Sequence, residues 1–66
     1  MKYQLLSKRE FEVLELVSSG SNNAKIARKL GISTATAKTH LRNIYSKTDA
    51  HNRTELAVGY LIYKGR

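Results

Sequence analysis

Only three residues, Gly31-Ile32-Ser33, separate two stretches of the chain that have the periodicity of amphipathic helices. Glycine adopts the left-handed backbone angles that end a helix, and a serine hydroxyl can cap the first amide groups of the next one. Because so short a connection holds the two helices against each other, small residues are needed where they cross. Ala27 and Ala37, on either side of the turn, meet that need. The sequence therefore predicts two helices that cross closely.

Capping patterns predict one further helix on each side of this pair. Ser7 and Glu10 have the spacing of a capping box, in which each side chain accepts a hydrogen bond from the other residue's amide, and Gly20 is placed to end that helix. Asn52 and Glu55 repeat the spacing near the other end of the chain. Proline is absent, and no segment shows the alternation typical of a strand. We expect an all-α fold of four helices.

Length and composition allow one small domain. A chain of 66 residues buries about 60% of its unfolded surface in a single modest core, which excludes barrels and doubly wound sheets. There is no cysteine, so a disulfide scaffold is excluded as well. We expect a single helix-turn-helix domain over residues 1–66, with the helix-turn-helix at about 22–47 and the fourth helix at about 53–64.

Helical spacing assigns a buried face to each helix. The residues expected to face inward are Phe11, Val13, Leu14 and Val17, then Ala24, Ile26, Ala27 and Leu30, then Ala37, Leu41, Ile44, Tyr45 and Thr48, and finally Ala57, Tyr60 and Leu61. The solvent face of the third helix is basic and polar, with Thr34, Ala35, Lys38, Thr39, Arg42 and Asn43. The fourth helix has surplus apolar residues, Val58 and Ile62, for which we expect a dimer surface; ordinary scattered surface residues are the alternative.

Charge is distributed unevenly along the chain. The sequence has 12 Lys and Arg against 5 Asp and Glu, a formal net charge of +7. Residues 16–48 contain no acid and hold Lys25, Arg28, Lys29, Lys38, Arg42 and Lys47. A basic surface of this kind favours nucleic acid as a partner, although charge alone is equally typical of a solvated face.

One set of residues covers nearly the whole chain, with a combined spacing far more specific than any of its parts. It comprises Leu6-Ser7-Lys8-Arg9-Glu10-Phe11-Glu12-Val13-Leu14, Gly20, Ser21-Asn22, Ile26-Ala27, Leu30-Gly31-Ile32-Ser33, Thr36-Ala37-Lys38-Thr39-His40, Ile44, Lys47 and Arg53. This set resembles the LuxR-type DNA-binding domain shared by NarL-like response regulators and GerE-like stand-alone regulators. The resemblance implies a four-helix fold whose third helix enters the major groove and whose fourth provides a dimer surface.

A few positions depart from the family's usual pattern. Asn23-Ala24-Lys25 stands where the family commonly has Lys-Glu, which raises the positive charge. Ala37, Thr48 and Ala50 stand where larger apolar residues are usual. We expect a less stable core, by about 0.8 kcal/mol for each buried methylene group lost.

The resemblance, applied position by position, implies that Lys38, Thr39 and Arg42 reach base edges, and helical spacing alone places them on the same face. Phosphate contacts are expected at the beginnings of the second and third helices and at the end of the third, from Asn22, Asn23, Lys25, Ser33, Thr34, Thr36 and Lys47. Three of these residues could instead have a simpler role. Ser33 can act only as a helix cap, and Lys25 and Lys47 can both be solvated cations. Lys47 can also stabilise the carboxyl end of its own helix.

We expect neither metal binding nor catalysis. His40 flanks the buried stripe of the third helix, His51 lies in a loop, and neither has the neighbours of a metal site. Glu12 and Glu15 are better explained by pairing with nearby cations than by catalysis. We expect a protein that is not an enzyme and has no metal or cofactor.

These observations predict a transcriptional regulator that binds double-stranded DNA as a homodimer in the bacterial cytoplasm, on the nucleoid when bound. RNA polymerase is a further candidate partner. The alternative function is a protein-interaction module that docks on an acidic partner such as the transcription machinery. No membrane partner is expected, because helix caps interrupt the basic residues and no apolar run is long enough to span a bilayer.

Overall fold

The computed structural model describes residues 2–65. These residues form a short 3-10 helix, η1 (Tyr3–Leu5), followed by α1 (Lys8–Ser18), α2 (Asn23–Leu30), α3 (Thr34–Thr48) and α4 (Arg53–Lys64). The described part of the chain has no strand, and the predicted all-α fold of four helices is confirmed. The short helix η1 was not expected from the sequence.

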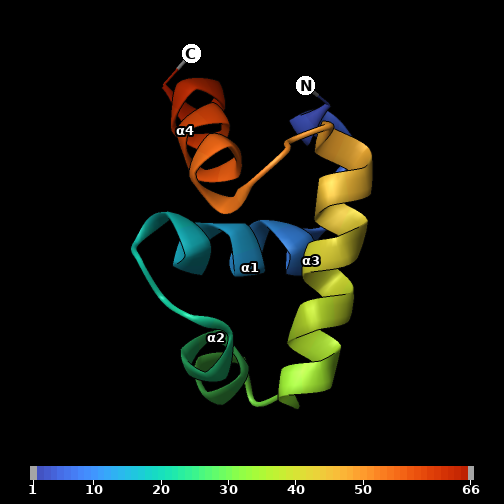
Figure 1. Ribbon diagram of the computed structural model, residues 1–66, viewed down its shortest axis with the longest axis vertical. Helices are drawn as coiled ribbons and strands as arrows, with labels where there is room; N and C mark the ends of the chain where they lie inside the picture. The colour runs from blue at the N-terminus through green and yellow to red at the C-terminus, as the bar shows by residue number, and fades with distance from the viewer. Residues whose placement is uncertain (1, 66) are drawn as a thin grey trace.

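The helices are arranged around α1, which lies across the middle of the molecule (Figure 1). The long helix α3 runs along one side, α2 lies below α1, and α4 lies above it. α1 packs against all three of the others, α2 packs against α3, and α4 rests mainly on α1. α2 and α4 therefore lie on opposite sides of α1, and α3 extends past both sides.

The predicted caps are formed. Ser7 accepts a hydrogen bond from the amide of Glu10 at 3.1 Å, and the Glu10 carboxylate accepts one from the amide of Ser7 at 2.8 Å. Gly20 and Gly31 follow α1 and α2 in left-handed conformations, with φ of +92° and +68°. A side chain is strained at such angles, so glycine suits both positions.

Asparagines cap α2 and α4. Asn22 is the N-cap of α2, because its side chain accepts a hydrogen bond from the amide of Lys25. Asn52 caps α4 as expected, but the Glu55 carboxylate accepts from the amide of His51. The second half of a capping box is therefore shifted by one residue there.

The core is formed by one cluster of buried apolar side chains: Tyr3, Leu6, Val13, Leu14, Val17, Ile26, Ala27, Ala37, Leu41, Ile44, Ala50, Leu56 and Tyr60. Ala27 and Ala37 are both in it, as close crossing of α2 and α3 requires. Thr48 is fully buried, and its hydroxyl donates to the carbonyl of Ile44 at 2.9 Å. The buried hydroxyl group of Thr48 therefore has a hydrogen-bond partner.

Two residues that were predicted to lie in the core are exposed. Ala24 is exposed, because it lies two residues before Ile26 and so on nearly the opposite side of α2. Leu61 is 54% exposed, because the buried stripe of α4 runs through Leu56 and Tyr60. Leu61 is one residue beyond that stripe, about 100° around the helix. Ala57 is half-buried and packs against the core.

An aromatic cluster fixes which side of α4 is buried. Tyr3 and Phe11 pack against Tyr60 and Tyr63, with ring centroids 5.6 to 6.3 Å apart. The Tyr3 hydroxyl also donates to the carbonyl of Leu56 at 2.9 Å. The segment that precedes α1 is thus bound to the last helix.

Candidate nucleic-acid interface

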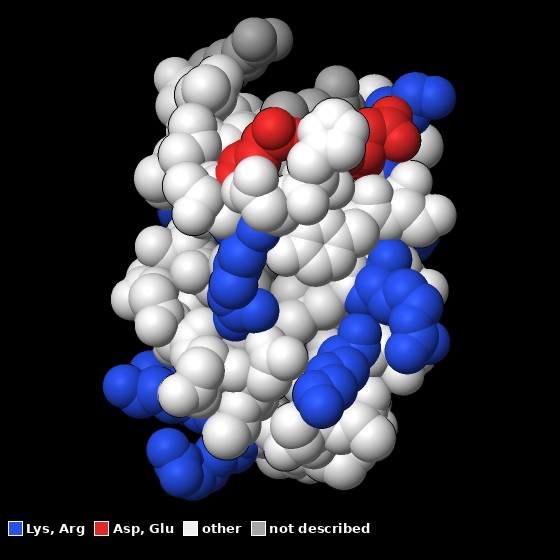
Figure 2. All heavy atoms as spheres, viewed as in Figure 1, with Lys and Arg blue, Asp and Glu red and all other residues white. Residues whose placement is uncertain are grey.

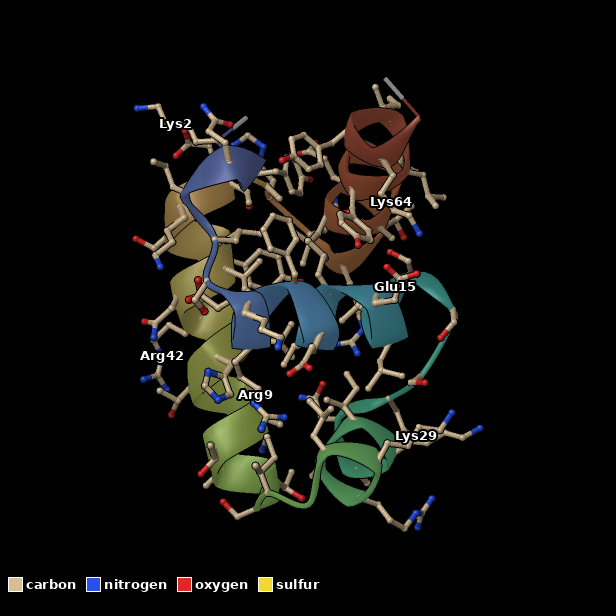
Figure 3. The ribbon with its side chains drawn as sticks, turned by 180° about the vertical axis from the view of Figure 1, so that it is seen from behind. Lys2, Arg9, Glu15, Lys29, Arg42 and Lys64 are labelled. Carbon is tan, nitrogen blue, oxygen red and sulfur yellow. The ribbon has the colours of Figure 1, made fainter. Side chains whose placement is uncertain are left out.

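The outer face of α3 is an exposed row of basic and polar side chains. Lys38, Thr39 and Arg42 are exposed, as are Thr34 and Asn43. This follows from helical spacing, because Ala37, Leu41 and Ile44 occupy the buried side. Figure 3 shows Arg42 extending from α3 away from the rest of the molecule. The structure thus brings the three predicted base-contacting residues onto one accessible surface.

Thr39 is already hydrogen-bonded within its helix. Its hydroxyl donates to the carbonyl of Ala35 at 3.1 Å, so its proton is occupied. What remains for an external partner is the methyl group and the acceptor capacity of the oxygen. This fits the apolar contact with a thymine methyl better than donation to a base.

The amino end of α3 combines a cap with free polar groups. The Ser33 hydroxyl accepts from the amide of Thr36 at 3.0 Å and donates to Thr36 Oγ1 at 2.9 Å. Thr34 and Thr36 are exposed, and no acidic residue lies in the first turn. Unpaired amides and the positive end of the helix dipole make such a turn suitable for an oxyanion.

The beginning of α2 is held by a residue from α4. One guanidinium nitrogen of Arg53 donates to Asn23 Oδ1 at 2.9 Å, and the other donates to the carbonyl of Ser21 at 2.8 Å. Asn22 is engaged as the cap, whereas Lys25 is exposed. Only the family resemblance pointed to Arg53 in the sequence, since no local spacing pairs it with Asn23, 30 residues away.

Lys47 is tied to the protein. Its ammonium lies 2.8 Å from Glu10 Oε1, and Glu10 is only 4% exposed. Burial alone would raise the pKa of Glu10, but hydrogen bonds from Lys47 and Ser7 outweigh burial and hold the pKa below its ordinary value of 4.5. The partners expected for Lys47 from the sequence were phosphate or the end of α3, and Glu10 was missed.

Some of the charged side chains are paired with each other. The ion pairs of Lys and Arg found among residues 2–65 are Arg9–Glu12, Lys47–Glu10 and Lys64–Glu15. His51 Nδ1 also lies 3.2 Å from Glu55 Oε1, a contact that is an ion pair only if the imidazole is protonated. Glu12 and Glu15 thus pair with cations, as predicted, and Figure 3 shows Lys64 beside Glu15 between α4 and α1. Lys25, Lys38 and Arg42 are in none of these pairs. In Figure 2 basic side chains dominate the lower part of the surface, over α2 and the amino-terminal part of α3, whereas the visible acids lie at the top, near the carboxyl end of α3.

Among residues 2–65, no three His, Cys, Asp or Glu side chains cluster as metal ligands would. His40 is half-buried on α3, and Nδ1 of His51 lies 3.2 Å from Glu55. None of the helices between residues 2 and 65 has the length and apolar character needed to cross a membrane.

α4 carries an exposed apolar surface. Val58, Leu61 and Ile62 are 50%, 54% and 56% exposed. Their spacing of three and four residues places them side by side on one face of the helix. The two residues predicted to be surplus are therefore exposed, and Leu61 joins them.

The sequence of the chain, over most of its length, is similar to those of bacterial regulatory proteins. The sequence model of a family described as bacterial regulatory proteins of the luxR family, GerE, matches residues 4–59. The chain is 52% identical over 52 residues to the monoamine regulon transcriptional regulator of Klebsiella aerogenes, a match that covers 79% of this chain and 23% of that protein.

Two further relatives come from other bacteria. The transcriptional regulatory protein LiaR of Bacillus subtilis is 43% identical over 58 residues, which cover 88% of this chain and 28% of LiaR. The response regulator protein VraR of Staphylococcus aureus is 39% identical over 56 residues, which cover 85% and 27%. The chain thus spans about a quarter of the length of these relatives.

Proposed function

The chain belongs to the LuxR family of bacterial regulatory proteins, and on that basis we propose that it reads a short DNA site through α3 and pairs with a second copy through α4. Membership makes it a helix-turn-helix DNA-binding domain of a transcriptional regulator, in a family that is not enzymatic. The observation that carries the proposal is the outer face of α3, where Lys38 and Arg42 are exposed and form no ion pair with a described residue.

The residue types on this face suit the edges of bases in the major groove. Lys38 and Arg42 can donate to O6 and N7 of guanine, and the methyl group of Thr39 can contact that of thymine. An α-helix fits the major groove, and exposed cations that no carboxylate neutralises are free to bind there. These three residues are assigned to base readout.

Backbone contacts are assigned to both sides of this face. Lys25, Thr34 and Thr36 are exposed and offer N–H or O–H donors to phosphate oxygens. Asn22 and Asn23 retain their side-chain NH₂ donors besides the contacts that hold them in the protein. Ser33 is assigned to the same set, with Thr36 Oγ1 as the acceptor of its hydroxyl proton in the free protein. Lys47 belongs to the same set, with Glu10 as its partner in the free protein.

Pairing is assigned to the exposed face of α4. Val58 and Ile62, with Leu61 between them, form an apolar surface too small for a tight dimer in free solution. Two half-sites on one duplex bring two copies together and raise their effective concentration. The expected operator is an imperfect palindrome.

Selection of bound sequences from random duplex DNA tests the proposal. We expect a recurrent short motif with inverted symmetry, bound with an affinity that falls steeply as salt increases because counterions are released from phosphates. Recovery of unrelated sequences, with equal binding to an acidic protein, would instead support a protein-interaction module. Affinity that did not change with salt would exclude phosphates as the main contacts.

A further inference from the structure

A cleft opens on the same side of the molecule as the outer face of α3. It has a volume of about 340 Å³ and is lined by Asn23, Lys38, Leu41, Arg42, Tyr45 and Arg53. It therefore joins the beginning of α2, the middle of α3 and the beginning of α4. In Figure 2 basic side chains border a hollow between α3 and the start of α4.

The cleft carries three cations and no lining carboxylate. None of the ion pairs between described residues includes Lys38, Arg42 or Arg53. Glu55, two residues from Arg53, does not line the cleft, and its carboxylate accepts from the amide of His51 at 2.9 Å. None of the described carboxylates therefore pairs with the three cations of the cleft.

Arg53 is the member of this set that is half-buried and fixed. Its guanidinium donates to two neutral acceptors, Asn23 Oδ1 and the carbonyl of Ser21. A guanidinium has five N–H donors, so these two bonds leave others for a ligand. A half-buried cation held only by neutral groups gains most from an anion, and planar guanidinium groups suit phosphate oxygens in particular.

Arg53 also orients Asn23. A side-chain amide has one acceptor oxygen and one NH₂ group that donates. Because Arg53 takes the oxygen, the NH₂ group is the end left for another partner. Phosphate oxygens only accept hydrogen bonds, so this orientation is the one that a phosphate requires.

We propose that this cleft binds one backbone phosphate of the DNA, and that Arg53, which lies outside the helix-turn-helix, is its central ligand. The proposal rests on the function proposed above and adds a defined anchor to it. Asn23 donates to the same phosphate, while Lys38 and Arg42 contribute charge from the side of the cleft that faces the bases. The anchor fixes the depth and angle at which α3 enters the groove without reading sequence.

A comparison of two charge-neutralising variants tests the role of Arg53. Arg53→Gln and Arg28→Gln remove the same charge, but Arg28 is exposed on α2 and does not line the cleft. In fluorescence anisotropy titrations on a half-site duplex and an unrelated duplex, Arg53→Gln is expected to weaken both by about five- to tenfold, with an unchanged specificity ratio and a salt slope reduced by about one. Arg28→Gln is expected to have a clearly smaller effect. Equal effects of the two variants would overturn the proposal.

A second pair of variants separates binding from folding. Asn23→Asp keeps an acceptor for Arg53 and places a carboxylate where the phosphate would lie, so it should raise the melting temperature and lower DNA affinity. Ala24→Asp adds the same charge to the same exposed first turn of α2 but outside the cleft. We expect a larger loss of DNA affinity for Asn23→Asp than for Ala24→Asp. An equal or smaller loss would contradict the proposal even if Arg53→Gln failed to fold.

The phosphate itself can be located with modified DNA. Each phosphate of the half-site is replaced in turn by an uncharged methylphosphonate. Replacement of one particular phosphate should weaken DNA binding by the wild-type protein but cause no further loss of binding by Arg53→Gln. If the cleft instead held a free phosphate ion, this difference between the two proteins would not depend on which DNA phosphate is replaced. If wild-type protein binds DNA but no phosphate position is coupled to Arg53, the proposed phosphate site is refuted while the proposed function stands. If wild-type protein does not bind duplex DNA, the proposed function fails first.

Discussion

Glu10 has a buried carboxylate that accepts hydrogen bonds from two donors. It accepts from the amide of Ser7 at the start of α1 and from Lys47 near the end of α3, two segments that are far apart in the sequence. A charge in such a place is stable only while both donors are present, because an unpaired buried carboxylate is strongly disfavoured. The residue therefore links helix capping to tertiary packing.

Acid is expected to weaken this link. Because the folded pKa of Glu10 lies below its ordinary value of 4.5, its contribution to stability is complete above pH 4.5 and is lost as pH falls through the folded pKa. Glu10→Gln should lower the free energy of unfolding at pH 7 by about 1 to 3 kcal/mol and flatten its fall in acid. Urea melts between pH 3 and 7 measure both effects.

The matched control is Glu12→Gln, which removes an exposed carboxylate paired with Arg9 at 3.4 Å. Exposed pairs of this kind contribute about 0 to 1 kcal/mol, so little change is expected. If the two variants had the same stability at every pH, the role given to Glu10 would be wrong.

Lys38, on the outer face of α3, and Lys25, on α2, should differ in their effects on DNA specificity. Lys38→Ala is expected to reduce the ratio between specific and random DNA affinity, by about 1 to 3 kcal/mol if a base contact is lost. Lys25→Ala should weaken both affinities alike, because phosphate contacts carry no sequence information. Competition titrations with a selected site and random duplex measure the ratios. An unchanged ratio for folded Lys38→Ala would remove it from base readout.

At the scale of the helices, features that depend on neighbouring residues could be predicted from the sequence. Contacts between residues of different helices could not. The caps at Ser7 and Ser33 depend on residues within one turn, and both are confirmed. The turn Gly31-Ile32-Ser33 and the exposed face of α3 follow from the same local rules. The DNA contacts assigned to that face remain predictions.

The buried side of α4 could not be read from its own residues. Apolar side chains occur all around this helix, so its periodicity leaves several faces equivalent. Tyr3 and Phe11 select the stripe that contains Tyr60, and they come from the other end of the chain. The contacts of Arg53 with Asn23 and of Lys47 with Glu10 escaped prediction for the same reason.

The crossing of α2 and α3 gives a prediction at this scale. Ala27 is 4% exposed and Ala37 is fully buried where these helices pack. Ala27→Leu adds three carbon atoms to a filled space and should destabilise the domain by about 1 to 3 kcal/mol. Thermal and chemical denaturation measure the loss. Ala24→Leu, on the exposed side of α2, is the control, and an equal effect of the two would contradict close crossing.

Across the whole molecule, the charged side chains are unevenly distributed. The surface of α2 and α3 carries Lys25, Lys38 and Arg42, which have no ion-pair partner in residues 2–65, whereas the acids paired with Arg9 and Lys64 lie on α1. A charge asymmetry of this kind orients a basic protein toward DNA before contact. The apolar face of α4 is exposed as well and remains available to a second copy.

Pairing through that face can be tested on DNA. Val58→Asp with Ile62→Asp should leave half-site binding measurable and abolish cooperative occupation of a full site, because two small apolar faces are replaced by repelling charges. Gel shifts on half and full sites measure the difference. The control adds two equal charges at the exposed Gln4 and Ser19 and should preserve cooperativity. Cooperativity retained by the first variant would exclude α4 as the pairing surface.

The way α4 is attached also has a consequence for the rates at which parts of the molecule open. α4 rests mainly on α1, with the Tyr3 hydroxyl and the Arg53 guanidinium as additional ties. An element held on one side can detach as a unit while the remainder stays folded. Amide hydrogens of α4 should therefore exchange with deuterium sooner than those of α1 and the buried half of α3. A population of molecules with α4 transiently released would keep α3 folded while losing both the surface for a second copy and the Arg53 side of the phosphate cleft.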